Sequence, residues 1–401
     1  MPDWESMDRP AEQGPPPPEP DDEPLIGVEI VPEALVLPRR PHPGFGWALL
    51  WCLGFLLVTQ LVPALVGGVI LIILLMGSPG GLDQFNNPKV LYNSDAFAYA
   101  MMPAMLLAQI LSIIMSCLVL RLVVGRHWPA IVALRRPGLA HLLFALVGLP
   151  GLMVIIMGVD GLAKGLPSFI NLEETMTMLG KWPWPLGVLI IGVGPGIGEE
   201  LWCRGFLGRG LVGRYGYLAG VLLTSFLFGL IHLEPHQAVY AMVMGVFLHG
   251  AYLATRSLLV PIILHMTNNS LSVLAMHIPA LKAIDMPAEQ IPWIVYATAI
   301  LLTGAVAWAL FQSRARLVDL PTPNLTSITS LPNLASITTA PSEVHLADEP
   351  GPATWRPAFP SVAYPPPHKA TRVMHPWPAW HSWLLVAVGL AVFVASCFFG
   401  G

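Results

Sequence analysis

The sequence predicts an all-α fold, a polytopic bundle of membrane-spanning helices, and its composition is the first reason. Of the 401 residues, 55% are hydrophobic and only 11% are charged, and the mean hydropathy is +0.65. A soluble domain carries about twice that charged fraction. Several apolar runs also reach the roughly 20 residues that a helix needs to cross a bilayer. We therefore expect an integral, multi-pass membrane protein, with the lipid bilayer as its surroundings.

Eight spans are expected in the core of this bundle, and a ninth near the C-terminus. The core spans cover residues 45–76, 97–124, 139–163, 186–207, 217–233, 238–254, 258–276 and 293–311. A final apolar run, 383–399, is about long enough to cross as well. Arginines precede the first span, follow the eighth, and otherwise occupy alternate loops. All these loops face one side if the N-terminus is cytoplasmic, as the positive-inside rule requires, and this agreement supports the number of spans.

The remaining segments are polar. Residues 1–43 are acidic and Pro-rich, which predicts a disordered tail. Residues 44–312 then form the transmembrane domain, 313–380 a flexible linker rich in Pro, Ser and Thr, and 381–401 the ninth helix. The net charge of −4 comes largely from the acidic tail, so it does not indicate nucleic-acid binding.

The fourth span contains two adjacent acids and an arginine, Glu199, Glu200 and Arg204. A charged side chain inside a membrane helix costs several kcal/mol unless it is paired or faces a wet cavity. One interpretation is that the nearby glycines break the helix, so that these residues are its solvated end. The other is a polar site within the membrane. On a helix, Glu200 and Arg204 are i, i+4 neighbours, whereas Glu199 points about 100° away, towards a substrate or water.

Two later spans supply matching polar groups. His232 closes the fifth span one turn after Phe228, and His265 and Asn269 lie one turn apart in the seventh. Both members of the second pair are costly in lipid, so they should face the bundle interior. One interpretation is that their N–H groups donate hydrogen bonds to a developing oxyanion. The other is that the two side chains form only an interhelical hydrogen-bond pair that holds the bundle together. Asn268 lies on another face of that helix, and we interpret it as structural.

Together these side chains suit activation of water and hydrolysis of a peptide bond. A metal is a second option, because His232, His265 and one glutamate resemble a His2Glu zinc set. The chain lacks the H-E-x-x-H spacing on one helix, which favours a metal-free, glutamate-based mechanism and no cofactor, although a divalent metal such as zinc stays open. Two alternatives use the same residue types, a non-catalytic membrane binding or immunity protein and a proton-linked transporter.

Three motifs together resemble the CPBP family of intramembrane proteases, which includes CAAX prenyl endopeptidases and bacterial abortive-infection proteins. They are E-E-x-x-x-R at 199–204, F-x-x-x-H at 228–232 and H-x-x-x-N at 265–269. Each motif is weak alone, but all three occur in order on successive predicted spans. The resemblance covers about residues 184–276, within the domain at 44–312, which it identifies as a protease domain.

The resemblance implies a glutamate-dependent intramembrane endopeptidase acting on a membrane-embedded or lipidated, prenylated-type protein or peptide. The residues it would use are the catalytic Glu199, Glu200, His232, His265 and Asn269 and the supporting Arg204 and Phe228. The first glutamate and His232 would activate the water. His265 and Asn269 would form the oxyanion hole, and the second glutamate and the arginine would support the site.

Overall fold

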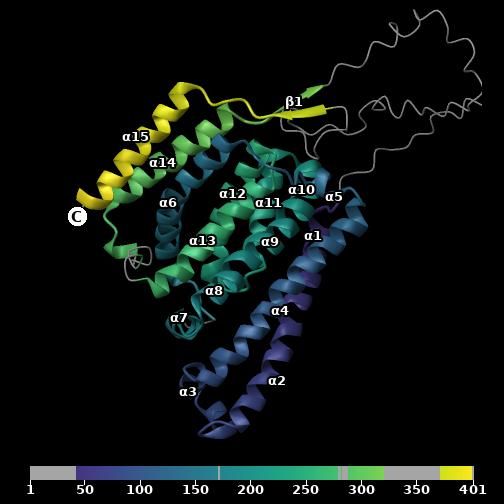
Figure 1. Cartoon of the computed structure of the whole chain (residues 1–401), viewed down its shortest axis with the longest axis vertical. Helices are drawn as coiled ribbons and strands as arrows, with labels where there is room; N and C mark the ends of the chain where they lie inside the picture. The colour runs from purple at the N-terminus through teal and green to yellow at the C-terminus, as the bar shows by residue number, and fades with distance from the viewer. Residues whose placement is uncertain (1–41, 170–171, 279–280, 282–287, 320–370, 400–401) are drawn as a thin grey trace, which may run out of the picture. The chain divides into compact units, whose positions relative to one another are not determined.

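The computed structural model describes residues 42–169, 172–278, 281, 288–319 and 371–399 (Figure 1). The acidic tail predicted at 1–43 lies almost entirely outside the described residues, and so does the middle of the linker, 320–370. Within the described part, eight helical segments are long and apolar enough to cross a membrane. They are Phe45–Met76, Asp95–Val124, Leu139–Leu162, Trp184–Tyr215, Pro235–Thr255, Leu259–His277, Trp293–Gln312 and Trp380–Phe399. Seven of the predicted core spans and the ninth span are thereby confirmed.

These segments contain most of the labelled helices. The α-helices are α1 (Phe45–Leu56), α2 (Val62–Met76), α4 (Asp95–Val119), α6 (Leu139–Leu162), α8 (Trp184–Gly187), α9 (Gly194–Glu200), α10 (Gly208–Tyr215), α12 (Pro235–Thr255), α13 (Leu259–His277), α14 (Trp293–Gln312) and α15 (Trp380–Phe399). Within three of the segments π-helical turns link the α-helices or extend one: η1 (Leu57–Leu61), η3 (Leu120–Val124), η5 (Val188–Val193) and η6 (Leu201–Leu207). The shorter helices are α3 (Pro88–Tyr92), α5 (Trp128–Ile131), α7 (Leu172–Gly180) and α11 (Tyr217–Leu230), with 3-10 turns η2 (Gly81–Asn86), η4 (Ala163–Gly165) and η8 (Ala288–Gln290).

The fifth predicted span is shorter than expected. Helix α11 has 14 residues and ends at Leu230, so it is only about 21 Å long at 1.5 Å per residue. Leu233 has a left-handed backbone with φ 61°, and Pro235 opens the next helix. Because the residue before a proline is disfavoured in the helical conformation, the chain must leave α11 before this point. His232 therefore lies in a turn after the helix, and the range 217–233 was too long.

The fourth span is continuous across its glycines. It runs for 32 residues from Trp184 to Tyr215 through η5, α9 and η6. The alternative of a short helix with a solvated charged end is therefore wrong. The glycines instead allow neighbouring helices to approach closely. A Cβ on Gly196, for example, would lie 3.0 Å from the backbone nitrogen of Met266 on α13. Two π-helical turns flank the acidic pair, and such turns are frequent at functional sites.

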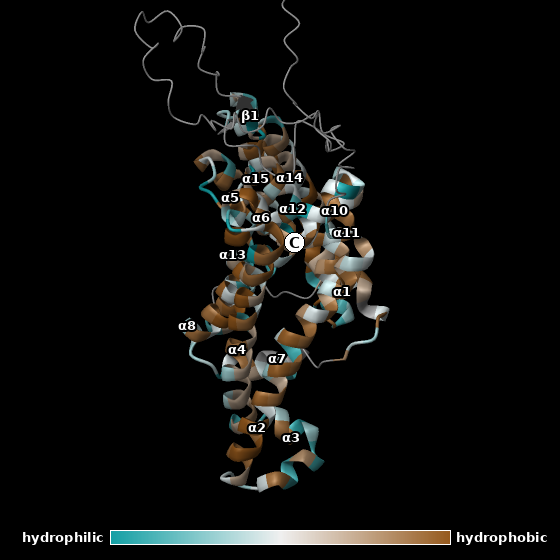
Figure 2. Cartoon of the chain, turned by 90° about the vertical axis from the view of Figure 1, so that its right-hand side faces the viewer, coloured by the Kyte–Doolittle hydropathy of each residue, from teal (hydrophilic) through white to brown (hydrophobic). Residues whose placement is uncertain are grey.

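Helix α9 has two direct neighbours, α4 and α13, which both pack on it (Figure 1). Helix α11 packs against α10 and α12. Helices α6, α14 and α15 pack in sequence on the far side of α12. In Figure 2, hydrophobic residues follow one another along much of α2, while hydrophilic residues are more frequent at α3 and β1. Exposed apolar side chains such as Leu65, Ile73 and Met76 on α2 are suited to contact with lipid.

The arginine-bearing loops meet at one end of the bundle. The amide of Leu258 donates to the Ala133 carbonyl over 2.9 Å, and the amide of Ala315 donates to the Ala254 carbonyl over 2.7 Å. Burial, and then the charge of a neighbouring arginine, lower the pKa of Arg256 to about 10. This side chain therefore remains cationic at neutral pH, and the end of the bundle that it shares is positively charged.

The two ends of the predicted linker are ordered. Strand β1 (Arg316–Asp319) pairs antiparallel with β2 (Thr371–Met374). The ninth helix, α15, begins at Trp380 and packs along α14. The hydroxyls of Thr298 and Ser396, 2.7 Å apart and buried, join these two helices. The linker is thus not flexible throughout, because its ends form a two-stranded ladder.

We expect Gly196→Ala to destabilise the fold, because the new methyl group meets the backbone of α13. Overpacking of this kind costs about 1–3 kcal/mol. Gly250→Ala on α12 is the matched control, since its methyl group would meet no heavy atom within 4 Å, and it should be neutral or stabilising by about 0.5–1 kcal/mol. Thermal unfolding of both variants in the same detergent checks this. Equal unfolding temperatures would show that α9 and α13 are not in close contact.

Candidate active site

A buried ion pair lies at the centre of the polar cluster. Nη1 of Arg204 lies 2.6 Å from Oε1 of Glu200, and neither side chain has exposed surface. Nη2 of Arg204 donates to the Gly245 carbonyl over 3.1 Å. The guanidinium carbon lies 4.3 Å from the centroid of the Phe228 ring. A charge-assisted hydrogen bond, a carbonyl and an aromatic face together hold the arginine in one position.

His265 extends this pair into a network. Its Nδ1 lies 2.9 Å from the same Glu200 oxygen that binds Arg204. Since a carboxylate only accepts, Nδ1 carries the proton and donates it. The imidazole edge also packs at 90° to the Phe228 ring, with centroids 5.7 Å apart. The structure therefore brings Glu200, Arg204, Phe228 and His265 together, from three different helices.

Glu199 and His232 form a second, more open pair. Nε2 of His232 lies 3.9 Å from Oε2 of Glu199, and their side chains are 14% and 18% exposed. Nδ1 of His232 lies 2.8 Å from the Phe228 carbonyl, so this nitrogen carries a proton. In the neutral ring, Nε2 is then an acceptor that faces the carboxylate. The separation is too long for a direct hydrogen bond.

Asn269 is held on the other side of the site. Its Nδ2 donates to the carbonyl of Ile191 in η5 over 3.1 Å, and Asn268 donates to its Oδ1 over 3.0 Å. A carboxamide has two N–H groups, and these contacts use one. Asn269 thus keeps a donor, although within the described residues no hydrogen bond joins it to Glu199, Glu200 or the two histidines. Asn268, interpreted as structural, orients it.

Trp202 does not join the polar cluster but packs against aromatic side chains of α1 and η6. Trp202 is fully buried and stacks on Phe55 of α1 with centroids 4.6 Å apart at 22°. Phe206 lies 5.2 Å from the same indole. From α4, the Ser116 hydroxyl donates to the Gly198 carbonyl over 3.0 Å. These contacts fix the helix that carries both glutamates.

Sequence reasoning missed the backbone acceptors of the site, the carbonyls of Ile191 and Gly245. Neither residue type signals such a role. The carbonyl of Ile191 lies within the π-helical turn η5, where the regular helical ladder is interrupted. The only signal for this turn is the run of glycines that follows it.

The metal alternative can be tested against the side chains. Among the residues that the structure describes, no three His, Cys, Asp or Glu side chains are arranged to hold a metal ion. His265 donates Nδ1–H to Glu200, and His232 donates Nδ1–H to a carbonyl. Nε2 of each ring is therefore the nitrogen that could ligate a metal.

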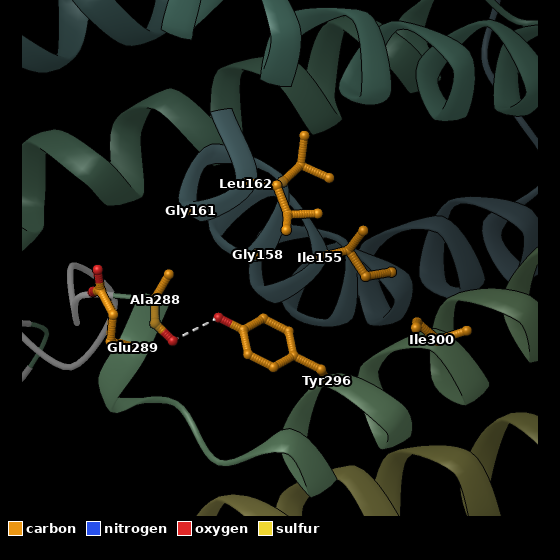
Figure 3. Close-up of a pocket in the computed structure, with 9 residues that line it drawn as sticks. Ile155, Gly158, Gly161, Leu162, Ala288, Glu289, Tyr296 and Ile300 are labelled. Carbon is orange, nitrogen blue, oxygen red and sulfur yellow. Dashed lines mark hydrogen bonds between the residues drawn. The ribbon is translucent and has the colours of Figure 1, made fainter. Parts of the chain in front are cut away.

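A surface groove elsewhere is not part of this cluster (Figure 3). It has a volume of about 480 Å³ and lies between α6 and α14, near η8. Its lining is apolar apart from Glu289 and the Tyr296 hydroxyl, and this hydroxyl donates to the Ala288 carbonyl over 2.9 Å. The groove shares no residue with the cluster around Glu199 and Glu200, so it is not a candidate for the active site.

The fold and the site are those of a polytopic helical membrane protein with charged and polar side chains gathered inside its bundle. Residues 181–271 match the family model described as type II CAAX prenyl endopeptidase Rce1-like. The matched segment contains all three motifs and nearly the whole site. It confirms the resemblance to CPBP-type proteases and supports a CAAX-type intramembrane protease. Comparisons with curated proteins and with solved structures gave no match.

Removal of the arginine should unfold the site. Arg204→Met leaves the Glu200 carboxylate buried without its cation, which costs about 3–5 kcal/mol when one member of a buried pair is deleted. The double variant Glu200→Gln, Arg204→Met has no buried charge there and should recover most of that loss. Thermal unfolding and monodisperse yield in detergent measure both. A single variant as stable as wild type would mean that the two side chains do not form a buried pair.

Proposed function

We propose that this chain is an intramembrane endopeptidase that hydrolyses a peptide bond of a membrane-embedded or lipidated protein or peptide. The observation that carries the proposal is the Glu199–His232 pair, 3.9 Å apart and partly exposed, beside a buried network. The family match at 181–271 supports the reaction class. It does not define the substrate, which we propose by chemical class alone.

In the proposed mechanism a single water donates one hydrogen to Glu199 Oε2 and the other to His232 Nε2. Both are acceptors, so the oxygen lone pairs of the water point away from them, towards a substrate carbonyl. The water oxygen bonds to the carbonyl carbon as Glu199 takes a proton, and the C=O electron pair moves to the carbonyl oxygen. That pair then re-forms the double bond, the C–N bond breaks, and the protonated Glu199 gives its proton to the leaving amine.

The negative carbonyl oxygen needs donors, and two residues are suitable. Asn269 has a second N–H that its contacts with Ile191 and Asn268 do not use. His265 donates Nδ1–H to Glu200, so it offers a second donor at Nε2 only as an imidazolium ion. Arg204 keeps the Glu200 carboxylate in place beside this ring. In this mechanism Glu200 supports a residue that binds the oxyanion, whereas Glu199 takes the proton from the attacking water.

The orientation of the chain is also part of this proposal. The arginine-bearing loops share one end of the bundle, and a cytoplasmic position for that end satisfies the positive-inside rule. The start of α1 lies beside α10, where the Phe45 amide donates to the Tyr215 hydroxyl over 3.1 Å, and a cytoplasmic N-terminus is part of the same proposal.

Glu199→Gln should abolish proteolysis without unfolding the protein, because the carboxamide is nearly isosteric but cannot accept the proton. Cells that express wild type or Glu199→Gln at equal levels are compared by proteomics of membrane-protein termini. We expect termini that appear only with wild type, and these name the substrate class. Glu289→Gln, an exposed acid remote from the site, is the control and should behave as wild type.

Identical termini with both proteins folded would refute the protease. The remaining interpretation would then be a non-catalytic membrane binding or immunity protein. Uptake or release driven by a pH gradient in proteoliposomes, lost in Glu199→Gln, would instead indicate the proton-linked transporter.

Asn269→Ala should lower kcat about 100- to 1,000-fold, the usual effect of removing one oxyanion donor. KM should change little, because the donor acts on charge that develops in the transition state. The assay uses a peptide that spans a junction found by the termini experiment. Asn93→Ala, at an exposed turn before α4, is the matched control. An unchanged kcat in Asn269→Ala would remove this residue from the oxyanion hole.

A further inference from the structure

The turn that carries His232 has an unfavourable backbone. Helix α11 has ended, and the next residue, Leu233, has φ 61°. The left-handed conformation costs free energy for any residue with a Cβ, and it persists only where the surroundings impose it. The hydrogen bond from the Leu233 amide to the Leu230 carbonyl is long, at 3.4 Å. His232 itself has local hydrogen bonds: its amide donates to the Gly229 carbonyl over 3.0 Å, and the Glu234 amide donates to its carbonyl over 2.7 Å. After Leu233, the turn is held by contacts from outside α11.

Glu234 makes one of these contacts. It is only 6% exposed, and its Oε2 accepts the backbone N–H of Phe169 over 2.9 Å. Burial alone raises the pKa of this carboxyl, but the Phe169 N–H, the Ser168 hydroxyl and the charge of His236 lower it below its ordinary value. The carboxylate is therefore the form that holds the loop at neutral pH. The Phe169 side chain is 73% exposed, so the backbone makes the contact.

A second contact comes from His236, two residues after Glu234. Its Nδ1 lies 3.2 Å from Oδ1 of Asp160, and its Nε2 lies 3.2 Å from the carbonyl of Leu166. Both facing atoms are acceptors, so an imidazolium ring satisfies both. Glu234 and His236 thus hold the same segment, residues 160–169, which leads out of α6. We call these two contacts the clasp.

We propose that Glu234 is a positioning residue for His232: through the clasp it holds the strained turn against residues 160–169 and so sets the distance from His232 to Glu199. The hydrogen bond from Nδ1 to the Phe228 carbonyl fixes only the ring. The backbone of His232 is fixed by the turn. The catalytic consequence rests on the proposed function, whereas the effect on the turn does not.

The test uses the full chain in lipid nanodiscs, with Glu234→Ala, Glu234→Gln and the control Asp83→Ala, an exposed acid in η2. Hydrogen exchange is followed in peptides that cover residues 228–236 and 160–169. Glu234→Ala should exchange faster in both peptides and nowhere else. Glu234→Gln keeps an acceptor oxygen for Phe169, so it should lie between alanine and wild type, and Asp83→Ala should match wild type in both peptides.

Kinetics then test the catalytic consequence on the peptide substrate described above. A displaced His232 should lower kcat by about 10- to 100-fold with KM unchanged, since misplacement by about 1 Å has effects of this size. Unchanged exchange in Glu234→Ala overturns the positioning role, whatever the protein cleaves. Faster exchange with an unchanged kcat overturns its catalytic consequence. If Glu234→Ala does not fold, the intermediate Glu234→Gln decides by the same two measurements.

The proposed function fails in a different way. If wild type and Glu199→Gln give identical termini, the endopeptidase is wrong. In that case the exchange of Glu234→Ala still decides whether the clasp holds the turn.

Discussion

The buried pair of Glu200 and Arg204 is the constraint on which the rest of the site depends. Two ions without exposed surface are tolerated inside a membrane bundle only if every charge has a partner. The partners come from elsewhere in the bundle: the Gly245 carbonyl on α12, the Phe228 ring on α11 and His265 on α13. Four helices are therefore brought to one point by one arginine and one carboxylate.

That requirement explains why the glutamates differ. Glu200 is committed to Arg204 and His265, and it has no exposed surface left for a substrate. Glu199 is next in sequence but points to another face of the helix, where it meets His232 and keeps some exposure. One short stretch thus places a fully buried, paired carboxylate beside a partly exposed one.

Sequence reasoning reached the elements and the members of the site but not the distances or the backbone partners. The i, i+4 relation of Glu200 and Arg204 follows from helical spacing alone. The approach of His265 needed the helix crossing that glycines permit, and the crossing is a tertiary feature. The end of α11 was misjudged because Ile231 and Leu233 are apolar, although Pro235 gave a signal. Glu234 was missed because its partner, Phe169, lies 65 residues earlier.

The pairing of β1 with β2 has a consequence for how this chain tolerates change. The ladder brings residues 319 and 371 together beside the bundle, whatever the length of the chain between them. Closing a loop costs free energy that grows only with the logarithm of its length. Deletions, or the insertion of a whole fluorescent domain, between these strands would therefore leave α15 seated on α14. The ladder thus makes the position of α15 independent of the length of the chain between the two strands.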